Sequence, residues 1–323
     1  MKKLLIACLL SFLVVGGCAP KKEAPSTQLE KFDFLIDWQA EPTYLGVYYA
    51  KDLGLFQKLG LDVSIIQSWG ANQAVSAVAS GRYKIATASG GATVLAYNND
   101  APIVSLGVLY PHIPTVIYGL AKSRVQQPKD LIGKTIGIYP ASITKNEFDA
   151  FVKIQKLDPN KLKIVSLSGP DIPLLLAGKV DAVLHYTEMS PVTVSLNPDV
   201  KVVQGKKVFE LHLADYGVGG YGLNVVTSRQ TLQKEPDMIR NIAQAVFQGY
   251  RIGCAQQQQA VDSFLKQFPD KDPAYVKESW SRVCGMVGSN PGQQSAEGWQ
   301  ETIELYRSLG LLTQSVEAKD VLP

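Results

Sequence analysis

Four aromatic residues stand where predicted strands end or where the chain crosses between predicted units, and such residues can stack on a flat ring. Trp38 follows the predicted strand 32–36, and the other three are Tyr44, Tyr186 and Tyr216. Stacked aromatic pairs contribute about 0.5–1.5 kcal/mol beyond the area they bury. Aromatic residues also pack in cores, and for the tyrosines both interpretations stay open. The polar stretch after Trp38 favours a cleft position for its indole.

Glu188 is the main polar candidate for ligand recognition. It follows the apolar strand 182–184 by four residues, at the edge of the sheet where α/β proteins bind ligands. Its carboxylate can accept two hydrogen bonds from an amine and a neighbouring ring N–H, and charge-assisted bonds are about twice as strong as neutral ones. The alternative to a ligand-binding role is a structural one. In it Glu188 is a solvated residue in the first turn of a helix over 187–195, where acidic side chains are favourable.

Two loops combine hydroxyl groups with the expected start of a helix. Ser89, Gly90 and Gly91 precede one predicted helix, and Ser142 and Thr144 precede another. Backbone N–H groups and hydroxyls at such positions can bind an oxygen or an anion. The same serine and threonine residues are also common N-caps. No Gly-Lys-Ser/Thr follows the glycines, so the loop is not a phosphate loop.

The histidines show no metal-site spacing. His112, His185 and His212 are scattered, and the pair His185-x-x-Glu188 lacks further ligands. We therefore expect no metal site, no cofactor and no catalytic residue, and we expect a structural or ligand-contacting role for the pair.

The N-terminus predicts a lipoprotein. A basic start, an apolar run over residues 4–15 and small residues before Cys18 form a signal peptide ending at a lipid-attachment cysteine. The run is shorter than the roughly 20 residues that span a membrane. We predict removal of residues 1–17, lipid on Cys18 and a polar tether over 18–30, with the body outside the cytoplasmic membrane on the periplasmic side or the cell surface. The alternative is an ordinary signal peptide with an incidental cysteine.

Charge and cysteine content narrow the function classes. Removal of the signal takes away Lys2 and Lys3, so 32 basic residues become 30 against 29 acidic ones, a balance of +1. This near-neutrality gives no electrostatic basis for nucleic-acid binding. Cys254 and Cys284 are the thiols that remain in the body. They form either a disulfide, worth about 3 kcal/mol, or two unpaired buried thiols.

Short apolar strands alternate with amphipathic helices from residue 32 onward. Predicted strands cover 32–36, 61–66, 85–88, 103–109, 115–121, 135–138, 163–167, 182–184, 201–203 and 221–227. Predicted helices cover 46–59, 71–79, 93–97, 145–156, 172–177, 238–251, 256–266, 273–283 and 295–309. The alternation implies an α/β fold with parallel pairing.

A body of about 290 residues is large for one core, and two consecutive α/β units predict two lobes around a cleft. We assign 31–111 and 229–323 to the first lobe and 112–228 to the second. Small ligands bind in such clefts.

Seven short motifs are spread over residues 32–310. They are DW at 37–38, GVYYAKDLGLF at 46–56, GLDV at 60–63, GRYKI at 81–85, DLIGK at 130–134, GKVDA at 178–182 and DYGV at 215–218. In these motifs the chain resembles ABC-transporter substrate-binding lipoproteins of the ThiY-like group. The resemblance implies a two-lobed periplasmic-binding-protein fold of type 2, a thiamine pyrimidine precursor-like ligand and an ABC permease in the cytoplasmic membrane as partner. It also implies a monomer that is not an enzyme, with a glutamate at position 188.

The chain departs from the pattern where the ligand is chosen. Pyrimidine-binding members carry a Pro-Asn segment and a histidine after the DW motif, whereas this chain has polar residues and Tyr44 at the histidine position. Gly219 and Gly220 replace a proline and aromatic residues, and this loss of bulk is expected to widen the cleft. Riboflavin and alkyl sulfonates, which relatives bind, are therefore alternative ligands.

The sequence leaves two other functions open. A sensor or scaffold lipoprotein would keep the fold and contact a membrane signalling partner. A pyrimidine synthase-like enzyme would resemble proteins that use a pyridoxal-bearing lysine, a sacrificial histidine and a cysteine-rich iron motif. The absence of a cysteine cluster and the lipoprotein signal disfavour the enzyme.

Overall fold

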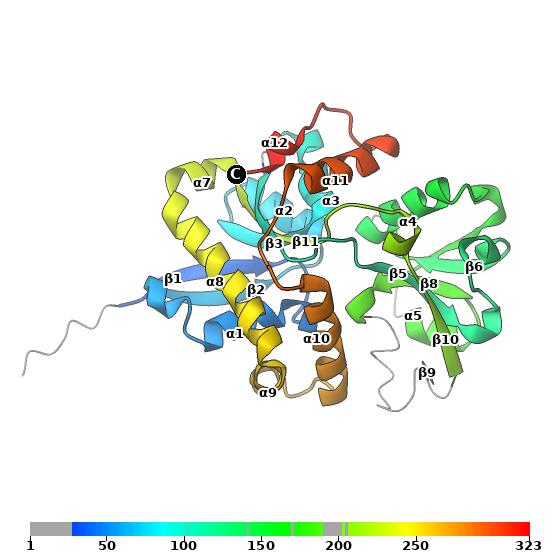
Figure 1. Ribbon diagram of the computed structural model, residues 1–323, viewed down its shortest axis with the longest axis horizontal. Coiled ribbons are helices and arrows are strands. Elements are labelled where there is room, and N and C mark those ends of the chain that lie inside the picture. Colours follow the sequence, from blue (N-terminus) through cyan, green and yellow to red (C-terminus); the bar gives the residue numbers. More distant parts are fainter. Residues whose placement is uncertain (1–27, 102, 141, 169–170, 190–201, 204–205) are drawn as a thin grey trace, which may run out of the picture.

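The computed structural model describes residues 28–101, 103–140, 142–168, 171–189, 202–203 and 206–323. Two α/β lobes lie next to each other, joined by two crossing segments (Figure 1). The predicted signal peptide and Cys18 lie outside the described residues. The predicted tether reaches Glu30, which is already the first residue of a strand. Among the described helices, none combines the length and apolarity that a membrane crossing requires.

The first lobe is built on a five-stranded mixed sheet in the order β2-β1-β3-β11-β4. Its strands are β1 Glu30–Ile36, β2 Leu61–Gln67, β3 Ile85–Ser89, β4 Ile103–Val108 and β11 Leu223–Ser228. β1 pairs in parallel with β2 and β3, whereas β11 inserts antiparallel between β3 and β4. We placed β11 in the second lobe, and its pairing corrects that boundary. The chain returns to the first sheet before it enters its C-terminal helices.

The second lobe contains a six-stranded mixed sheet in the order β7-β6-β8-β5-β10-β9. Its strands are β5 Thr115–Leu120, β6 Thr135–Ile138, β7 Lys163–Ser166, β8 Ala182–Tyr186, β9 Val202–Val203 and β10 Lys206–His212. β6 is parallel to β7 and β8, but β5 is antiparallel to β8 and β10. The expected parallel pairing is therefore present in both sheets, but each sheet also contains antiparallel pairs that the alternation of strands and helices did not predict. β10 was missed, although Phe209 and Leu211 alternate with polar residues at the period of a strand.

Helices cover both sheets. They are α1 Leu45–Asp52, α2 Ala71–Ala79, α3 Gly90–Leu95, α4 Ile143–Ile154, α5 Asp171–Leu176, α7 Arg229–Lys234, α8 Pro236–Ala255, α9 Gln257–Gln267, α10 Pro273–Val287, α11 Ala296–Ser308 and α12 Ala318–Val321. Several begin with local signals: Asp272 and Ser295 accept hydrogen bonds from backbone N–H groups in the first turn, and Pro236 and Pro273 stand at first positions. Short 3-10 helices include η1 Pro42–Tyr44 and η7 Thr187–Met189.

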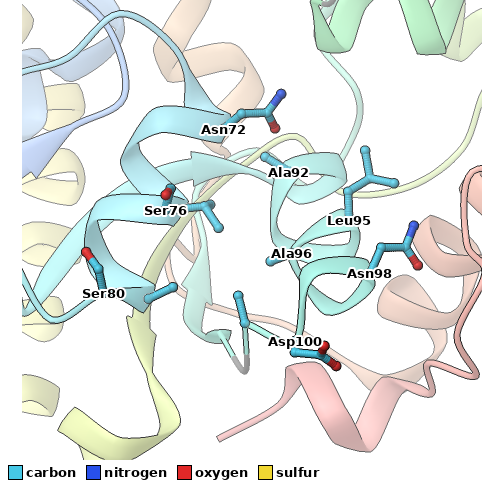
Figure 2. Close-up of a pocket in the computed structure, with 11 residues that line it drawn as sticks. Asn72, Ser76, Ser80, Ala92, Leu95, Ala96, Asn98 and Asp100 are labelled. Carbon is cyan, nitrogen blue, oxygen red and sulfur yellow. The ribbon is translucent and has the colours of Figure 1, made fainter.

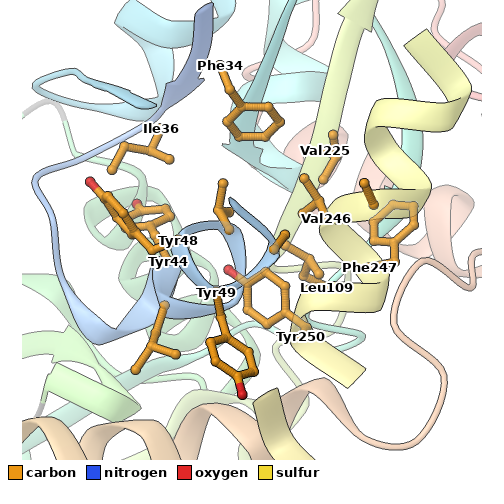
Figure 3. Packing of buried hydrophobic residues seen from close by; sticks show 14 of the residues in the cluster. Phe34, Ile36, Tyr44, Tyr48, Tyr49, Leu109, Val225, Val246, Phe247 and Tyr250 are labelled. Atoms are coloured by element: carbon orange, nitrogen blue, oxygen red, sulfur yellow. The ribbon is translucent and has the colours of Figure 1, made fainter. Parts of the chain in front are cut away.

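The main core lies between α1, α8 and the first sheet. Figure 3 shows tyrosines of η1 and α1 close to apolar side chains of α8. The close approach requires glycine, because a Cβ on Gly249 would overlap the carbonyl oxygen of Gly46, and a Cβ on Gly46 would overlap the ring of Tyr250. This packing sets the position of η1, whose residues Thr43 and Tyr44 line the cleft between the lobes.

Cys254 of α8 and Cys284 of α10 form a disulfide, with Cα atoms 5.3 Å apart and a sequence separation of 30. Of the two alternatives for these cysteines, the disulfide is therefore confirmed. Closing a loop of this length stabilises the fold by about 3.5 kcal/mol on chain-entropy grounds. The bond fastens α10, a helix that contacts both η1 and η7.

The two crossing segments are hydrogen-bonded to each other. The Tyr110 N–H donates to the Leu223 carbonyl at 2.9 Å, and the Gly222 N–H donates to the Tyr110 carbonyl at 2.9 Å. α11 packs along the second crossing, and a Cβ on Gly219 would overlap the Glu301 side chain. The glycines at 219 and 220 therefore permit contact with α11, which is a different role from the widening of the cleft that we expected.

Candidate functional site

A cleft of about 530 Å³ lies between the two lobes. Both lobes contribute side chains and backbone to its walls. The lining residues are Asp37, Trp38, Thr43, Tyr44, Trp69, Gly70, Ala71, Asn72, Gln73, Tyr139, Pro140, Ser142, Ile143, Thr144, Leu184, His185, Tyr186 and Met189. This volume lies within the usual range of 300–1,000 Å³ for small-molecule sites.

Five residues that the sequence predicted for the site line this cleft. They are Trp38, Tyr44, Ser142, Thr144 and Tyr186. They come from the end of β1, from η1, from the start of α4 and from the end of β8. The structure thus brings together residues from strand ends and helix starts of both lobes, as expected for a binding site in an α/β protein.

Ser89, Gly90 and Gly91 do not line the cleft. The Ser89 hydroxyl accepts a hydrogen bond from the Ala92 N–H at 3.2 Å and caps α3. A Cβ on Gly90 would overlap the Tyr221 carbonyl oxygen, and one on Gly91 would overlap the Tyr306 hydroxyl. In this conformation the loop caps α3 and allows tight packing against the second crossing and α11.

Tyr216 and Glu188 also lie outside the cleft lining. Tyr216 packs edge-on against Phe151 of α4, with ring centroids 5.8 Å apart. Glu188 is completely buried at the junction of the lobes. Its Oε1 accepts hydrogen bonds from the Thr43 hydroxyl at 2.8 Å and the Tyr110 hydroxyl at 3.3 Å. It therefore connects η7 of the second lobe to η1 and the first crossing.

Burial raises the pKa of the Glu188 carboxyl, even though hydrogen bonds and the charge of Arg282 act in the opposite direction. Its second oxygen, Oε2, is shielded from solvent and has no hydrogen-bond partner among the described residues. An unpartnered buried oxygen is costly to keep ionised. Ser279 of α10 donates to the Glu188 carbonyl at 2.7 Å, so the disulfide-linked helix holds this turn in place.

Asp37 is a site residue that we missed, although its position at the end of β1 beside Trp38 was a visible signal. Its Oδ1 accepts hydrogen bonds from the Tyr44 hydroxyl at 2.8 Å and the Thr87 hydroxyl at 2.6 Å. The other carboxylate oxygen, Oδ2, accepts no hydrogen bond from a described residue. It is also not one of the unpartnered polar atoms that the fold shields completely from solvent. Asp37 therefore offers one free acceptor to the cleft that it lines.

Burial raises the pKa of the Asp37 carboxyl, and the hydrogen bonds from Thr87 and Tyr44 partly oppose this shift. A ligand that brings an amine to Oδ2 would favour the ionised form, because a hydrogen bond to the charged form lowers a carboxyl pKa. Tyr44 acts here through its hydroxyl, and the residue is 4% exposed and belongs to the core cluster.

Two indoles stand at the mouth of the cleft. Trp38 is 40% exposed and Trp69 is 72% exposed, and their rings meet edge to face with centroids 6.3 Å apart. The sequence analysis did not identify Trp69 as a stacking residue, although a tryptophan in the polar segment after β2 was a usable signal. Exposed indoles of this kind offer apolar faces that a bound ring can cover.

The start of α4 supplies hydroxyl groups to the second wall. The Ser142 Oγ accepts from the Lys145 N–H at 3.2 Å and lies 2.9 Å from the Thr144 Oγ1. One turn deeper in α4, Glu147 is buried and hydrogen-bonded to the Thr115 hydroxyl. Burial raises the pKa of the Glu147 carboxyl to about 8.

The cleft lining contains no lysine, arginine or cysteine among the described residues. Anywhere among the described residues, no three histidine, cysteine, aspartate or glutamate side chains come together in a cluster that could hold a metal ion. The charged groups of the lining are Asp37 and, when protonated, His185. An amine or a neutral polar ring therefore matches this site better than a multiply charged anion does.

A second hollow, of about 760 Å³, lies between α2 and α3 on the first lobe alone (Figure 2). It meets the cleft at Asn72, which lines both spaces. The side chains of Asn98 and Asp100 at its far end are hydrogen-bonded to the segment 311–314. Its lining comes from one lobe and contains no aromatic side chain among the described residues, so the interlobe cleft is the stronger candidate.

Comparison with known proteins adds the family. The family model described as NMT1/THI5 like matches residues 41–260. The formylaminopyrimidine-binding protein of Halalkalibacterium halodurans is 23% identical, and the alignment covers 98% of this chain and 96% of that protein. The 4-amino-5-hydroxymethyl-2-methylpyrimidine phosphate synthase of Schizosaccharomyces pombe is 19% identical over 89% of this chain and 84% of that protein.

Among solved structures, the periplasmic aliphatic sulphonate binding protein SsuA from Escherichia coli superposes with a TM-score of 0.70 at 17% identity. The match covers 91% of this chain and 97% of SsuA. The two mixed sheets and their crossings thus form the periplasmic-binding-protein fold, which confirms the predicted fold class.

Proposed function

The chain belongs to the NMT1/THI5-like family, and we propose that it is an extracytoplasmic binding protein that captures an amino-substituted aromatic heterocycle for an ABC permease. The name of its formylaminopyrimidine-binding relative supports this class of ligand. The observation that carries the proposal is the pairing, in one cleft, of exposed indole faces with a buried carboxylate that has a free oxygen.

The free Oδ2 of Asp37 favours a donor-bearing ring over a sulfonate. An exocyclic amine can donate to this oxygen, and a hydrogen bond to a charged group is worth about 1.5–3 kcal/mol. A sulfonate would meet the carboxylate without a lysine or arginine in the described lining to offset the repulsion. Trp38 and Tyr186 would then cover the faces of the ring, while Ser142 and Thr144 would contact polar substituents.

Glu188 has a different proposed role from the one we expected first. It lies outside the cleft lining and joins the lobes through Thr43 and Tyr110. We infer that it controls the relative position of the lobes and thereby the shape of the site. Closure of the lobes around the ligand is the change that a permease would read, and its extent depends on the difference in ligand affinity between open and closed forms.

The proposal includes anchoring and partners. Lipid on Cys18 would hold the body at the outer side of the cytoplasmic membrane, within reach of the permease, and the protein would act as a monomer. A lysine able to bind pyridoxal is absent from the described cleft lining, which favours binding over the chemistry of a synthase. The family assignment alone does not make this distinction, because relatives of both kinds match.

Calorimetric titration of the purified body tests the proposal. We expect a 4-aminopyrimidine with a polar side chain to bind more tightly than riboflavin or an alkyl sulfonate, with one ligand per chain. Mass spectrometry of material that co-purifies from the host identifies the natural ligand independently. Tighter binding of the sulfonate, or no binding of any heterocycle, would refute the proposed ligand class.

A further inference from the structure

His185 lies in the wall of the cleft and contacts a buried aspartate. It belongs to β8 and its side chain is 21% exposed, whereas the Asp171 side chain at the start of α5 is 6% exposed. The Nε2 atom of His185 is hydrogen-bonded to the Oδ2 atom of Asp171. None of the recognition roles proposed above uses this pair.

Two contacts orient the imidazole. The Asp171 carboxylate can only accept a hydrogen bond, so it holds the ring in the tautomer that carries hydrogen on Nε2. The Tyr118 ring packs against the imidazole, with centroids 5.5 Å apart and planes inclined by 52°. A polar side chain held on two sides is preorganised, because its rotamer is set before a ligand arrives.

The other ring nitrogen, Nδ1, is open to a ligand. Nδ1 makes no hydrogen bond to a described residue. It is also not one of the unpartnered polar atoms that the fold shields completely from solvent. In the tautomer that Asp171 selects, Nδ1 has a lone pair and accepts hydrogen bonds. The wall of the second lobe therefore presents an acceptor whose direction is fixed.

The first lobe presents a matching acceptor. Asp37 lines the same cleft, and its Oδ2 also has no partner among the described residues. Two acceptors on opposite lobes suit a ligand that has N–H donors at two separate positions. A ligand that lacks one donor would leave one acceptor unpaired when the lobes close, and an unpaired polar group in a closed site lowers affinity.

We propose that His185, positioned by Asp171, is a specificity-determining residue that accepts a hydrogen bond through Nδ1 from a second N–H group of the bound heterocycle. The first donor of that ligand meets Asp37 on the opposite lobe. This inference rests on the proposed function, because it specifies which amino-substituted rings the cleft selects. Asp171 is a positioning residue and does not touch the ligand.

A pair of ligands and a pair of variants test the assignment. The ligands are a 4-aminopyrimidine that carries an amide N–H on its side chain and the same compound methylated at the amide nitrogen. His185→Gln places an amide near the position of Nε2, which keeps a contact with Asp171 but removes the Nδ1 acceptor. His185→Asn places its amide near the position of Nδ1 and loses the contact with Asp171.

We expect the wild type to bind the N–H compound about ten-fold more tightly than its methylated form. His185→Gln should bind both compounds alike, whereas His185→Asn should retain part of the preference. His112→Gln, which changes an exposed histidine outside the cleft lining, should behave as wild type. Asp171→Asn should reduce the preference less than His185→Gln does, and thermal melts of each variant verify folding.

The outcomes separate this inference from the proposed function. If the wild type bound neither compound, the proposed function would fail. If the wild type bound them with a preference that His185→Gln retained, His185 would have no role in selection and only this inference would fail. If His185→Gln instead abolished binding of an alkyl sulfonate that the wild type binds, His185 would act as a cation, which overturns its assignment as an acceptor.

Discussion

Replacement of Asp37 by asparagine separates ligand recognition from stability. The carboxylate is expected to strengthen ligand binding, whereas its burial lowers the stability of the ligand-free protein. Asparagine keeps the size of the side chain and an oxygen that can accept from Tyr44 and Thr87. Its amide nitrogen would then occupy the position of Oδ2 and present hydrogens to the donors of the ligand. We expect affinity for an aminopyrimidine to fall by about 1.5–3 kcal/mol, or roughly 10- to 150-fold.

Stability should respond in the opposite direction. The folded-state pKa of Asp37 is raised by burial, so the folded protein holds this proton more tightly than the unfolded chain. For a raised carboxyl pKa, stability is highest below the unfolded value and declines as the pH rises toward the folded value. Asparagine removes this decline, so the ligand-free variant should be at least as stable as wild type at neutral pH.

Calorimetric titration and thermal melting at pH 7, without ligand in the melts, measure the two effects. Asp33→Asn is the matched control, since Asp33 lies exposed on β1, the strand that Asp37 directly follows. We expect the control to leave affinity unchanged. A lower melting temperature for Asp37→Asn with unchanged affinity would show that the carboxylate stabilises the fold and does not contact the ligand.

Four further variants have distinct expected results. Trp38→Ala should weaken ligand binding by about 1–2 kcal/mol in calorimetry with little change in melting temperature, because its indole is 40% exposed; a loss of stability alone would place it in the core. Glu188→Gln should reduce affinity less than Asp37→Asn, since glutamine can still accept from Thr43; an equal loss would indicate direct contact with the ligand. Burial raises the pKa of the Glu147 carboxyl to about 8, so Glu147→Gln should raise the free energy of unfolding by up to about 3 kcal/mol at pH 7. The variant should also lose less stability than wild type as the pH rises from about 4.5 to 8. Denaturant titrations at pH 5 and pH 8 measure this difference, and the same loss of stability in both proteins would contradict the prediction. The double replacement of Cys254 and Cys284 by serine should lower the free energy of unfolding by about 3.5 kcal/mol with unchanged ligand affinity, as urea titration and calorimetry can test.

Local patterns predicted most elements of the fold. Apolar strands such as β1 and helices such as α8 were found within a few residues of their ends, because alternation, periodicity and N-terminal caps depend on neighbours in the chain. β10 was missed because Val208 and Phe209 are two consecutive apolar residues, which leaves only a short stretch of strict alternation up to His212. The motifs also predicted the fold class through their resemblance to ABC-transporter substrate-binding proteins, and the superposition on a periplasmic binding protein confirms that class.

Pairing between distant segments was decided by the tertiary structure. β11 inserts between β3 and β4 although more than 100 positions separate it from either strand, and this places it in the first lobe. Whether Cys254 and Cys284 meet depended in the same way on how α8 and α10 pack. Sequence spacing contains no information on such distances once the chain has crossed between lobes.

The candidate site shows the same division. Trp38, Ser142 and Thr144 were identified because strand ends and helix starts are visible in the sequence. The free oxygen of Asp37 depends on Thr87, which is 50 positions away, and the burial of Glu188 depends on Thr43, which is 145 positions away. The sequence by itself determined which elements form and which kinds of side chain stand at their ends. Only the tertiary structure decided which of those side chains face the cleft, because burial and hydrogen bonding are properties of contacts between segments that the chain brings together on folding.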